Sequence, residues 1–485
     1  MQTVIASETV AVKSRFHFID QIIPNFFKIL QVFALGFIIY TFCQPAELSR
    51  EAWLLFSIFV SSIFAIILKP FPMGAITVLA VGALIATKTI SLSTVLQGFS
   101  NDLIWLIVMA CFLGRGVIKT GLGRRIAYVF ISIFGGSPLG LSYGLLLSAT
   151  TMAPLIPSAT ARTGGIILPV LKSIVPMIND EKKHGRLAEY LTFIVLNSSV
   201  ITSCMFITSN GGNPIVVKFA KNLGISIDWG TWALAALVPA VVCLILLPIL
   251  LKFFIPCQLP DAAVVKAHAH EELKAMGKIS NKEKITLVVF GFLLLFWSCG
   301  HIFNIQPTEA AILGVGLFLL CGIITWKDVL GEELAWDTFF WMAILIMMAT
   351  EMQTLGVIDY FTKQLVAYIP ASHWILSCLT VSLIYFYTHY FFASTTAHLS
   401  SMFPALVAIL FSLGAPPLVT ALAFGFLTNL CGGLTQYSSG PMPIIYAQGY
   451  IEFKSWLKIG FITSLFYLVV WLGFGFCWWK VLGLF

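Results

Sequence analysis

Two short stretches of small and hydroxyl-bearing residues stand about 235 positions apart, Pro157-Ser158-Ala159-Thr160-Ala161-Arg162 and Ala393-Ser394-Thr395-Thr396-Ala397-His398. Each lies in the middle of an apolar segment and is too polar to continue as a plain membrane helix. A helix that ends and restarts there leaves backbone N–H groups unpaired beside short hydroxyl side chains, and both can donate to an anion. The repetition predicts two matching cradles, one for each carboxylate of a small diacid.

A second pair of interruptions follows these motifs, Ser209-Asn210-Gly211-Gly212-Asn213-Pro214 and Ser438-Ser439-Gly440-Pro441-Met442-Pro443. Proline and glycine break a helix and expose backbone groups that neighbours, water, ions or substrate must satisfy. A simple proline kink is the alternative, although a kink does not require polar residues in both copies. The substrate-binding residues that we expect are Ser158, Ala159, Thr160, Arg162, Asn210, Gly211, Asn213, Ser394, Thr395, Thr396, Ser438, Ser439, Gly440 and Pro441.

Arg162 and His398 occupy corresponding places after the two Ser/Thr motifs. An arginine inside an apolar segment is costly, so a partner or a function is expected for it. Two roles stay open: Arg162 binds a substrate carboxylate, or it forms a structural pair with Glu351 or Asp337. For His398, a hydrogen-bonded structural role is favoured over proton coupling, and His389 is expected to pack.

The composition identifies the class of protein that must position these residues. Hydrophobic residues make up 59% of the 485 residues, charged residues make up 10%, and the mean hydropathy is +0.95. This excludes a soluble globule and predicts an all-α polytopic membrane protein. Eleven apolar runs are long enough to be transmembrane helices, near residues 26–43, 53–68, 73–90, 103–118, 187–222, 231–254, 284–304, 309–325, 337–354, 416–449 and 456–480.

Two further apolar segments, 139–178 and 373–413, carry the Ser/Thr motifs at their centres. Their arms look too short or too interrupted to cross separately, so both are expected to be re-entrant hairpins surrounded by protein or a wet cavity. With a cytoplasmic N-terminus, this topology places most of the 28 lysines and arginines in cytoplasmic loops. The net charge of +7 therefore indicates membrane orientation, and no nucleic-acid partner is expected.

The repetition also divides the chain. We expect an N-terminal segment and first span at 1–50, a first repeat at 51–255, a cytoplasmic linker with an amphipathic helix at 256–283, and a second repeat at 284–485. Asn197 in the first repeat falls near Asn429 in the second. Each repeat crosses the membrane an odd number of times, so the copies are expected to be inverted relative to one another.

The cysteines give no sign of a cofactor or metal framework. All ten fall singly, mostly within the apolar spans, and none belongs to a CxxC pair. Packing as small hydrophobic side chains is the favoured interpretation, and neither a metal site nor a cofactor is expected.

The motifs resemble those of the divalent anion/sodium symporter family, in particular its citrate/succinate antiporter and plastid 2-oxoglutarate/malate translocator branch. The resemblance rests on three stretches and extends over nearly the whole chain: Pro157 to Gly165, His389 to His398, and Lys119-Thr120-Gly121-Leu122-Gly123-Arg124-Arg125-Ile126-Ala127. It implies a homodimer in which each protomer has a fixed scaffold and a mobile part that carries the substrate by an elevator-like displacement.

The chain departs from the family's usual Ser-Asn-Thr tip, because Ala159 and Thr395 stand where asparagine is usual. In sodium-coupled relatives, the tips and the broken helices share cation sites. The loss of both amide oxygens therefore argues against tight sodium binding, and leaves weak sites at Ser158, Gly211, Ser394 and Gly440 as the sodium positions to consider.

The expected function is exchange of C4 to C5 dicarboxylates, such as 2-oxoglutarate and malate, across a bacterial inner membrane, with no enzymatic activity. A sodium-coupled di- or tricarboxylate symporter is the alternative within the family. A passive anion channel is the alternative from another class, since pores also use helix ends.

Overall fold

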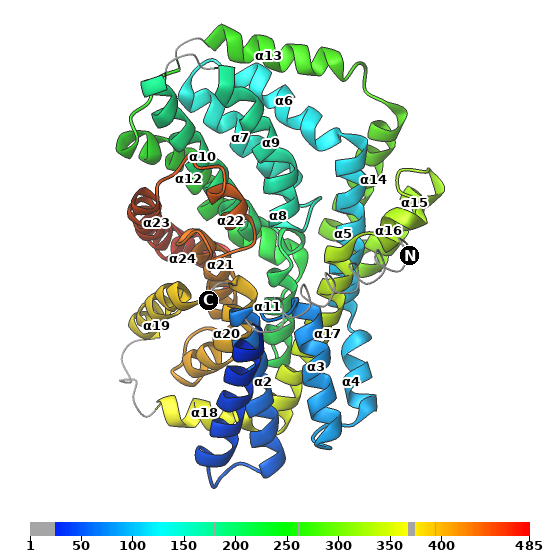
Figure 1. Cartoon of the computed structure of the whole chain (residues 1–485), viewed down its shortest axis with the longest axis vertical. Coiled ribbons are helices and arrows are strands. Elements are labelled where there is room, and N and C mark those ends of the chain that lie inside the picture. The colour runs from blue at the N-terminus through cyan, green and yellow to red at the C-terminus, as the bar shows by residue number, and fades with distance from the viewer. Residues whose placement is uncertain (1–24, 178–180, 260–261, 367–373, 393) are drawn as a thin grey trace, which may run out of the picture. The chain divides into compact units, whose positions relative to one another are not determined.

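A computed structural model describes residues 25–177, 181–259, 262–366, 374–392 and 394–485, and every regular element in these ranges is a helix (Figure 1). The N-terminal stretch before residue 25, Ala393, and the expected hairpin ends at 178 and 373 lie outside them. The chain divides into two compact units, one of Met1–Ser100 with Asp337–Phe361 and one of Asn101–Trp336 with Thr362–Phe485. Each unit therefore takes residues from both expected sequence repeats.

The first unit is a group of mainly apolar helices. The Trp53 indole donates to the Ile39 carbonyl (2.9 Å) and joins the first two helices, while the Gly74 N–H donates to Asp337 Oδ1 (2.9 Å). The unit contains the helix Asn25–Phe42, α2 (Arg50–Leu68), α3 (Met73–Ala86), α4 (Leu92–Phe99), most of α17 (Glu333–Thr354) and the start of α18 (Val357–Val366).

The second unit is built around α10 (Glu181–Met205). In the apolar part of this helix, within Arg186–Met205, 94% of the residues are buried. Helix α10 contacts helices from both halves of the chain. The other helices of this unit are α5 (Asp102–Thr120), α6 (Leu122–Phe134), α7 (Pro138–Met152), α8 (Ala159–Arg162), η1 (Thr163–Ile167), α9 (Leu168–Ile174), η2 (Val175–Met177), η3 (Ile207–Ser209), α11 (Gly212–Asn222), α12 (Trp229–Phe254), α13 (Ala262–Ala275), α14 (Asn281–Phe303), α15 (Pro307–Leu320), α16 (Trp326–Leu330), α19 (Trp374–Thr388), η4 (His389–Phe391), α20 (Thr395–Ser412), α21 (Pro417–Leu430), η5 (Cys431–Gly433), α22 (Pro441–Tyr446), α23 (Phe453–Leu468), η6 (Val469–Phe474) and α24 (Gly475–Val481).

The runs 73–90 and 309–325, both expected to be spans, form helices that are shorter than the runs themselves. Helices α3 and α15 have 14 residues each, which is roughly 21 Å of rise against a hydrocarbon core of about 30 Å. Left-handed backbone at Lys88 (φ 56°) and Gly322 (φ 64°) follows each helix and stops it from continuing. Among the described residues, nine helices are long and apolar enough to cross a membrane.

The helices break at both Ser/Thr motifs, as the sequence predicts. In the first segment, α7 ends at Met152 and the chain becomes helical again at Ala159; in the second, η4 ends at Phe391 and α20 begins at Thr395. The arms of the second segment are longer than expected, since Trp374–Phe391 and Thr395–Ser412 each have 18 residues. A 3-10 turn at 389–391 lengthens the first of these arms.

The order of helices repeats along the chain. Helices α5 to α12 and α17 to α24 both run as a long helix, a short amphipathic helix, two arms around a Ser/Thr motif, a broken helix and a long final helix. The serine before each second arm, Ser158 or Ser394, is the N-cap of the helix that follows. The short helices α6 and α18, which the list of spans did not contain, fall at matching places in this order.

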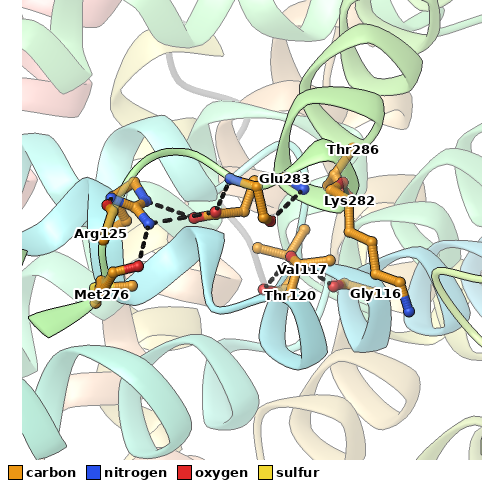
Figure 2. A network of polar contacts seen from close by, with 10 residues as sticks. Gly116, Val117, Thr120, Arg125, Met276, Lys282, Glu283 and Thr286 are labelled. Carbon is orange, nitrogen blue, oxygen red and sulfur yellow. Dashed lines mark hydrogen bonds and ion pairs between the residues drawn. The ribbon is translucent and has the colours of Figure 1, made fainter.

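The amphipathic helix expected in the linker is present as α13, which packs along α6 (Figure 1). Arg125 on α6 holds the chain that follows α13, as Figure 2 shows. Its guanidinium donates to both carboxylate oxygens of Glu283 (2.5 and 3.3 Å) and to the carbonyls of Met276 (3.2 Å) and Gly277 (2.9 Å). The Glu283 carboxylate also accepts the Ser280 N–H (2.7 Å), which completes a capping box at the start of α14.

Substituting Glu283 with glutamine is expected to lower the free energy of unfolding by about 1–3 kcal/mol at neutral pH, because it weakens a charged hydrogen bond at a carboxylate that is only 3% exposed. Burial opposes ionisation of Glu283, but hydrogen bonds from Arg125 and Ser280 outweigh it and lower its pKa. The stability that ionised Glu283 contributes is therefore present above its unfolded pKa of about 4.3 and is lost as the pH falls through the lower folded pKa.

Melting of the purified protein in detergent, followed by tryptophan fluorescence, measures this effect. The difference between wild type and Glu283→Gln should be constant near neutral pH and should narrow below about pH 4. Glu271→Gln, at an exposed position of α13, is the matched control and should melt as wild type does. Equal melting temperatures of Glu283→Gln and Glu271→Gln at pH 7 would contradict the stabilising role of the contact between Arg125 and Glu283.

Candidate substrate-binding site

The two Ser/Thr motifs form the same local structure, and we refer to residues 158–162 as tip 1 and residues 394–398 as tip 2. Ser158 Oγ accepts the N–H of Ala161 (3.1 Å), and Ser394 Oγ accepts the N–H of Ala397 (3.3 Å). Both serines have extended backbone and act as N-caps. Each cap leaves its own hydroxyl hydrogen and the first N–H groups of the following helix available to an acceptor.

The helices after the tips differ in regularity. At tip 1, α8 has four residues but continues without interruption through the π-helical turn η1 into α9. At tip 2, α20 is a regular helix of 18 residues. The N-terminal end of a helix carries a partial positive charge, so both tips present an electrostatic environment that favours an anion.

The two broken helices also share one local structure. We name residues 206–211, between α10 and α11, break 1, and residues 431–440, between α21 and α22, break 2. In break 1, Ser209 Oγ donates to the carbonyls of Ser203 (2.8 Å) and Phe206 (2.7 Å). In break 2, Ser438 Oγ makes the same pair of contacts with Gly432 (2.6 Å) and Thr435 (2.8 Å). Each serine hydroxyl satisfies carbonyls that the end of a helix leaves open.

Break 2 lies against both tips. A methyl group placed on Gly440 would come within 2.4 Å of Thr160 Oγ1, so the backbone of break 2 approaches tip 1 as closely as a glycine allows. A methyl group on Gly432 would lie 3.2 Å from Thr395 Cγ2 and 3.3 Å from Ser439 Cβ. Residues 236 positions apart in the sequence, Thr160 and Thr396, therefore belong to segments that pack on the same short loop.

A chain of asparagines connects break 1 to the second repeat. Asn210 Nδ2 donates to Asn429 Oδ1 (2.5 Å), and Asn429 Nδ2 donates to Asn213 Oδ1 (2.7 Å). Asn213 in turn donates to the carbonyls of Ser203 and Phe206, both at 2.8 Å. Asn429 is not among the site residues expected from the sequence. Its alignment near Asn197 was the available signal, but Asn197 bonds Phe193 and Tyr467 instead.

Arg162 and His389 hold equivalent carbonyls behind the two tips. Arg162 is fully buried, and its two terminal nitrogens donate to Ile156 O (2.7 Å), Ser209 O (3.1 Å), Thr202 Oγ1 (3.2 Å) and Ser203 Oγ (3.2 Å). His389 Nε2 donates to Ser438 O (3.0 Å). All four partners of Arg162 are uncharged, and neither Glu351 nor Asp337, the expected ion-pair partners, is among them. These neutral hydrogen bonds favour a structural role over the binding of a substrate carboxylate. The hydrogen bond of Arg162 to Ser209 O therefore corresponds to the one that His389, and not His398, makes with Ser438 O.

The expected site residues fall into an accessible group and a buried group. The buried group has four members: Asn213, Ser438, Arg162 and Pro441. The first three are fully buried and form hydrogen bonds with other protein groups. These four residues can shape the site but are not accessible to a ligand. The accessible group consists of Ser158, Ala159, Thr160, Asn210, Gly211, Ser394, Thr395, Thr396, Ser439 and Gly440. These residues offer hydroxyls, one amide and helix N-terminal N–H groups, which suit a small polar anion.

Substituting Asn429 with alanine is expected to lower the unfolding free energy by about 1–3 kcal/mol, because the amides of Asn210 and Asn213 then lose a buried partner. Ligand affinity should fall as well, since Asn210 is part of the accessible surface of the site. Melting of the purified variant with and without ligand measures both effects. Asn197→Ala is the matched control: it should melt lower than wild type but keep the same ligand-induced shift. If ligand raised the melting temperature of Asn429→Ala as much as that of wild type, the proposed link from Asn429 through Asn210 to the ligand would be wrong.

Known proteins with similar sequences give this site a context. Residues 24–485 match the family described as "Sodium:sulfate symporter transmembrane region". The chain belongs to this family, the divalent anion/sodium symporters. It is 40% identical to Dicarboxylate transporter 1, chloroplastic, of Spinacia oleracea over 93% of this chain and 80% of that one. It is 32% identical to the L-tartrate/succinate antiporter of Escherichia coli over 90% of this chain and 94% of the other.

Other matches bear on the membrane location and the fold. The inner membrane protein YbhI of Escherichia coli is 31% identical over 94% of this chain and 98% of its own length. The solved YdaH transporter of Alcanivorax borkumensis has a similar fold, with a TM-score of 0.51 over 80% of this chain and 88% of that chain at 11% identity. This member of the divalent anion/sodium symporter family is therefore a multi-pass integral membrane protein, as its composition predicts.

Proposed function

We propose that this symporter-family member is an antiporter that exchanges C4 to C5 dicarboxylates, of the 2-oxoglutarate and malate type. The observation that carries the proposal is the pair of matching serine N-caps, Ser158 and Ser394, on segments that both pack against break 2. Two equivalent anion cradles fit a substrate with two carboxylates. A dicarboxylate transporter and a tartrate/succinate antiporter among the relatives support the same class of substrate.

Each tip is proposed to bind one carboxylate through backbone N–H groups and two hydroxyls, Ser158 with Thr160 at tip 1 and Ser394 with Thr396 at tip 2. Asn210, Ser439 and Gly440 close the site between them. Arg162 is proposed as a positioning residue: its charge lies behind tip 1 and favours an anion there, while its hydrogen bonds hold tip 1 against break 1. Sodium is not required in this scheme, because Ala159 offers no side-chain oxygen.

Counter-exchange in proteoliposomes tests the proposal. Vesicles preloaded with unlabelled malate should take up labelled 2-oxoglutarate in choline buffer at the same rate as in sodium buffer, and empty vesicles should take up little. Uptake that needed a sodium gradient and no internal substrate would replace the antiporter with the sodium-coupled symporter. Uptake of neither dicarboxylate in any condition would overturn the assignment of substrate class.

The membrane arrangement belongs to the same proposal. We infer that the two apolar segments around the tips are re-entrant hairpins in inverted repeats, that the chain forms a homodimer, and that transport follows an elevator-like displacement in a bacterial inner membrane. The matching order of helices in the two halves and the inner-membrane relative support this arrangement. Light scattering of the detergent-solubilised protein should give the mass of two chains.

A further inference from the structure

Three buried side chains with metal-binding groups gather behind tip 2. His389 comes from η4, His398 from α20 and Cys431 from η5, and each is 0% exposed. One ligand atom from each, a ring nitrogen or the thiol sulfur, lies within 4.8 Å of the other two. The three residues are spread over 43 positions, so no short motif in the sequence reveals them.

The hydrogen bonds of the two histidines leave one nitrogen of each ring with a free lone pair. His389 Nε2 faces the Ser438 carbonyl (3.0 Å), which can only accept, so this nitrogen carries the hydrogen. His398 Nε2 lies 3.1 Å from Thr388 Oγ1, and it donates to that oxygen when the Thr388 hydrogen is directed to the Tyr385 carbonyl (2.9 Å). Nδ1 of both rings is then unprotonated, buried and without a hydrogen-bond partner.

An unpartnered buried acceptor costs about 1–3 kcal/mol. Two of them on neighbouring rings, whose centroids are 4.9 Å apart, favour a bound cation or a proton donor. Histidines that bind metals typically donate their second ring N–H to a carbonyl or another fixed acceptor, as both of these rings do. A cysteine sulfur as the third donor selects a thiophilic ion, whereas sodium, magnesium and calcium require oxygen ligands.

We propose that His389, His398 and Cys431 bind one thiophilic metal ion, Zn²⁺ or Cu⁺, through two imidazole nitrogens and a thiolate. When the ion binds, the Cys431 thiol releases to solvent the proton that it otherwise donates to the Thr428 carbonyl (3.2 Å), and a sulfur–metal bond replaces the S–H bond. Three protein ligands complete a trigonal Cu⁺ site, whereas Zn²⁺ takes its fourth ligand from water. This differs from the expectation of packed cysteines and no metal site, because the sequence does not show that Cys431 lies beside the two histidines.

The position of this metal site is related to that of Arg162. In the first repeat, the Arg162 cation lies behind tip 1 and donates to the Ser209 carbonyl. In the second repeat, His389 donates to the equivalent carbonyl of Ser438 but carries no permanent charge. A bound metal ion supplies a cation behind tip 2 and joins the start of α20 to break 2. Metal binding does not rest on the proposed function, although any effect on dicarboxylate affinity does.

Metal analysis of the purified full chain tests the site without substrate. After treatment with a chelator, the protein is incubated with Zn²⁺, or with Cu⁺ under reducing conditions, desalted, and analysed for metal content. One equivalent per chain of one of the two ions is expected, and the two arms identify which. Cobalt added in place of zinc should give a thiolate-to-metal absorption band in the wild-type protein, and Cys431→Ser should remove this band.

Variants separate this site from adventitious binding. His398→Ala and Cys431→Ser should each reduce the bound metal by about tenfold or more. The controls Cys243→Ser and His268→Asn remove residues that lie outside the cluster, and these should retain one equivalent. Retention of metal by Cys431→Ser, or less than one-tenth of an equivalent bound by wild type, would overturn the proposal. If a variant fails to fold, the wild-type protein decides by the thiolate-to-metal absorption of its cobalt form and of its Cu⁺ form, and the absence of both bands excludes a thiolate ligand.

Discussion

Replacing Arg162 with methionine is expected to destabilise the protein by about 3 kcal/mol or more and to abolish dicarboxylate exchange. Methionine fills a similar volume but leaves the carbonyls of Ile156 and Ser209 without donors in a fully buried environment. Each such carbonyl costs about 1–3 kcal/mol, and tip 1 also loses its attachment to break 1. Melting in detergent and counter-exchange in proteoliposomes measure the two effects.

Two further substitutions define the role of Arg162. Arg162→Lys keeps the charge but cannot reproduce the planar donor geometry that reaches four partners. The free energy of unfolding of this variant should therefore lie between that of Arg162→Met and that of wild type. Arg124→Met, at an exposed arginine of α6, should melt as wild type does. If Arg162→Met melted normally and only raised the substrate concentration needed for half-maximal exchange, Arg162 would bind substrate and the positioning role would be wrong.

Substituting Gly440 with alanine is expected to have the second largest effect. The added methyl group would lie 2.4 Å from Thr160 Oγ1, which is closer than real contacts allow, so the Thr160 hydroxyl must be displaced, by rotation of its side chain or by separation of tip 1 from break 2. Overpacking of this kind costs about 1–3 kcal/mol. Exchange should fall much further than stability, because the displaced hydroxyl is one of the proposed carboxylate donors.

A double variant tests whether the clash with Thr160 is the cause. In Gly440→Ala combined with Thr160→Ala, the atom nearest to the new methyl group is absent, so the melting temperature should recover relative to Gly440→Ala alone. Exchange should stay low, since Thr160 itself is lost. Gly165→Ala is the matched glycine control, because a methyl group there meets nothing within 4 Å. Additive losses of stability in the double variant would contradict the contact between tip 1 and break 2.

The tips and breaks could be predicted from the sequence because their structure is local. A serine cap at Ser158 or Ser394 depends on an N–H three residues away, and the interruption before Pro214 depends on glycine and asparagine beside it. The number of spans was less predictable. Apolar composition continues through Lys88 and Gly322, so it did not indicate where left-handed backbone ends α3 and α15.

The contacts that assemble the site could not be predicted, because they join residues far apart in the sequence. Asn429 bonds Asn213 across 216 positions, and His389 reaches the Ser438 carbonyl across 49. Alignment of the repeats paired His398 with Arg162 by position, but a different histidine makes the equivalent hydrogen bond. The two repeats have the same backbone turns at the tips and breaks, but different side chains support these turns. Only the three-dimensional contacts show which side chain bonds the carbonyl behind each tip.

A structure of the protein with bound malate or 2-oxoglutarate, determined in a lipid nanodisc, tests the central claim most directly. The claim predicts one ligand with a carboxylate within hydrogen-bond distance of Ser158 and Thr160 and the other within that distance of Ser394 and Thr396. A second anion-binding candidate is a cavity of about 530 Å³ whose lining includes Lys119, Arg124 and Arg125. A dicarboxylate bound there, with both tips unoccupied at saturating concentration, would contradict the account.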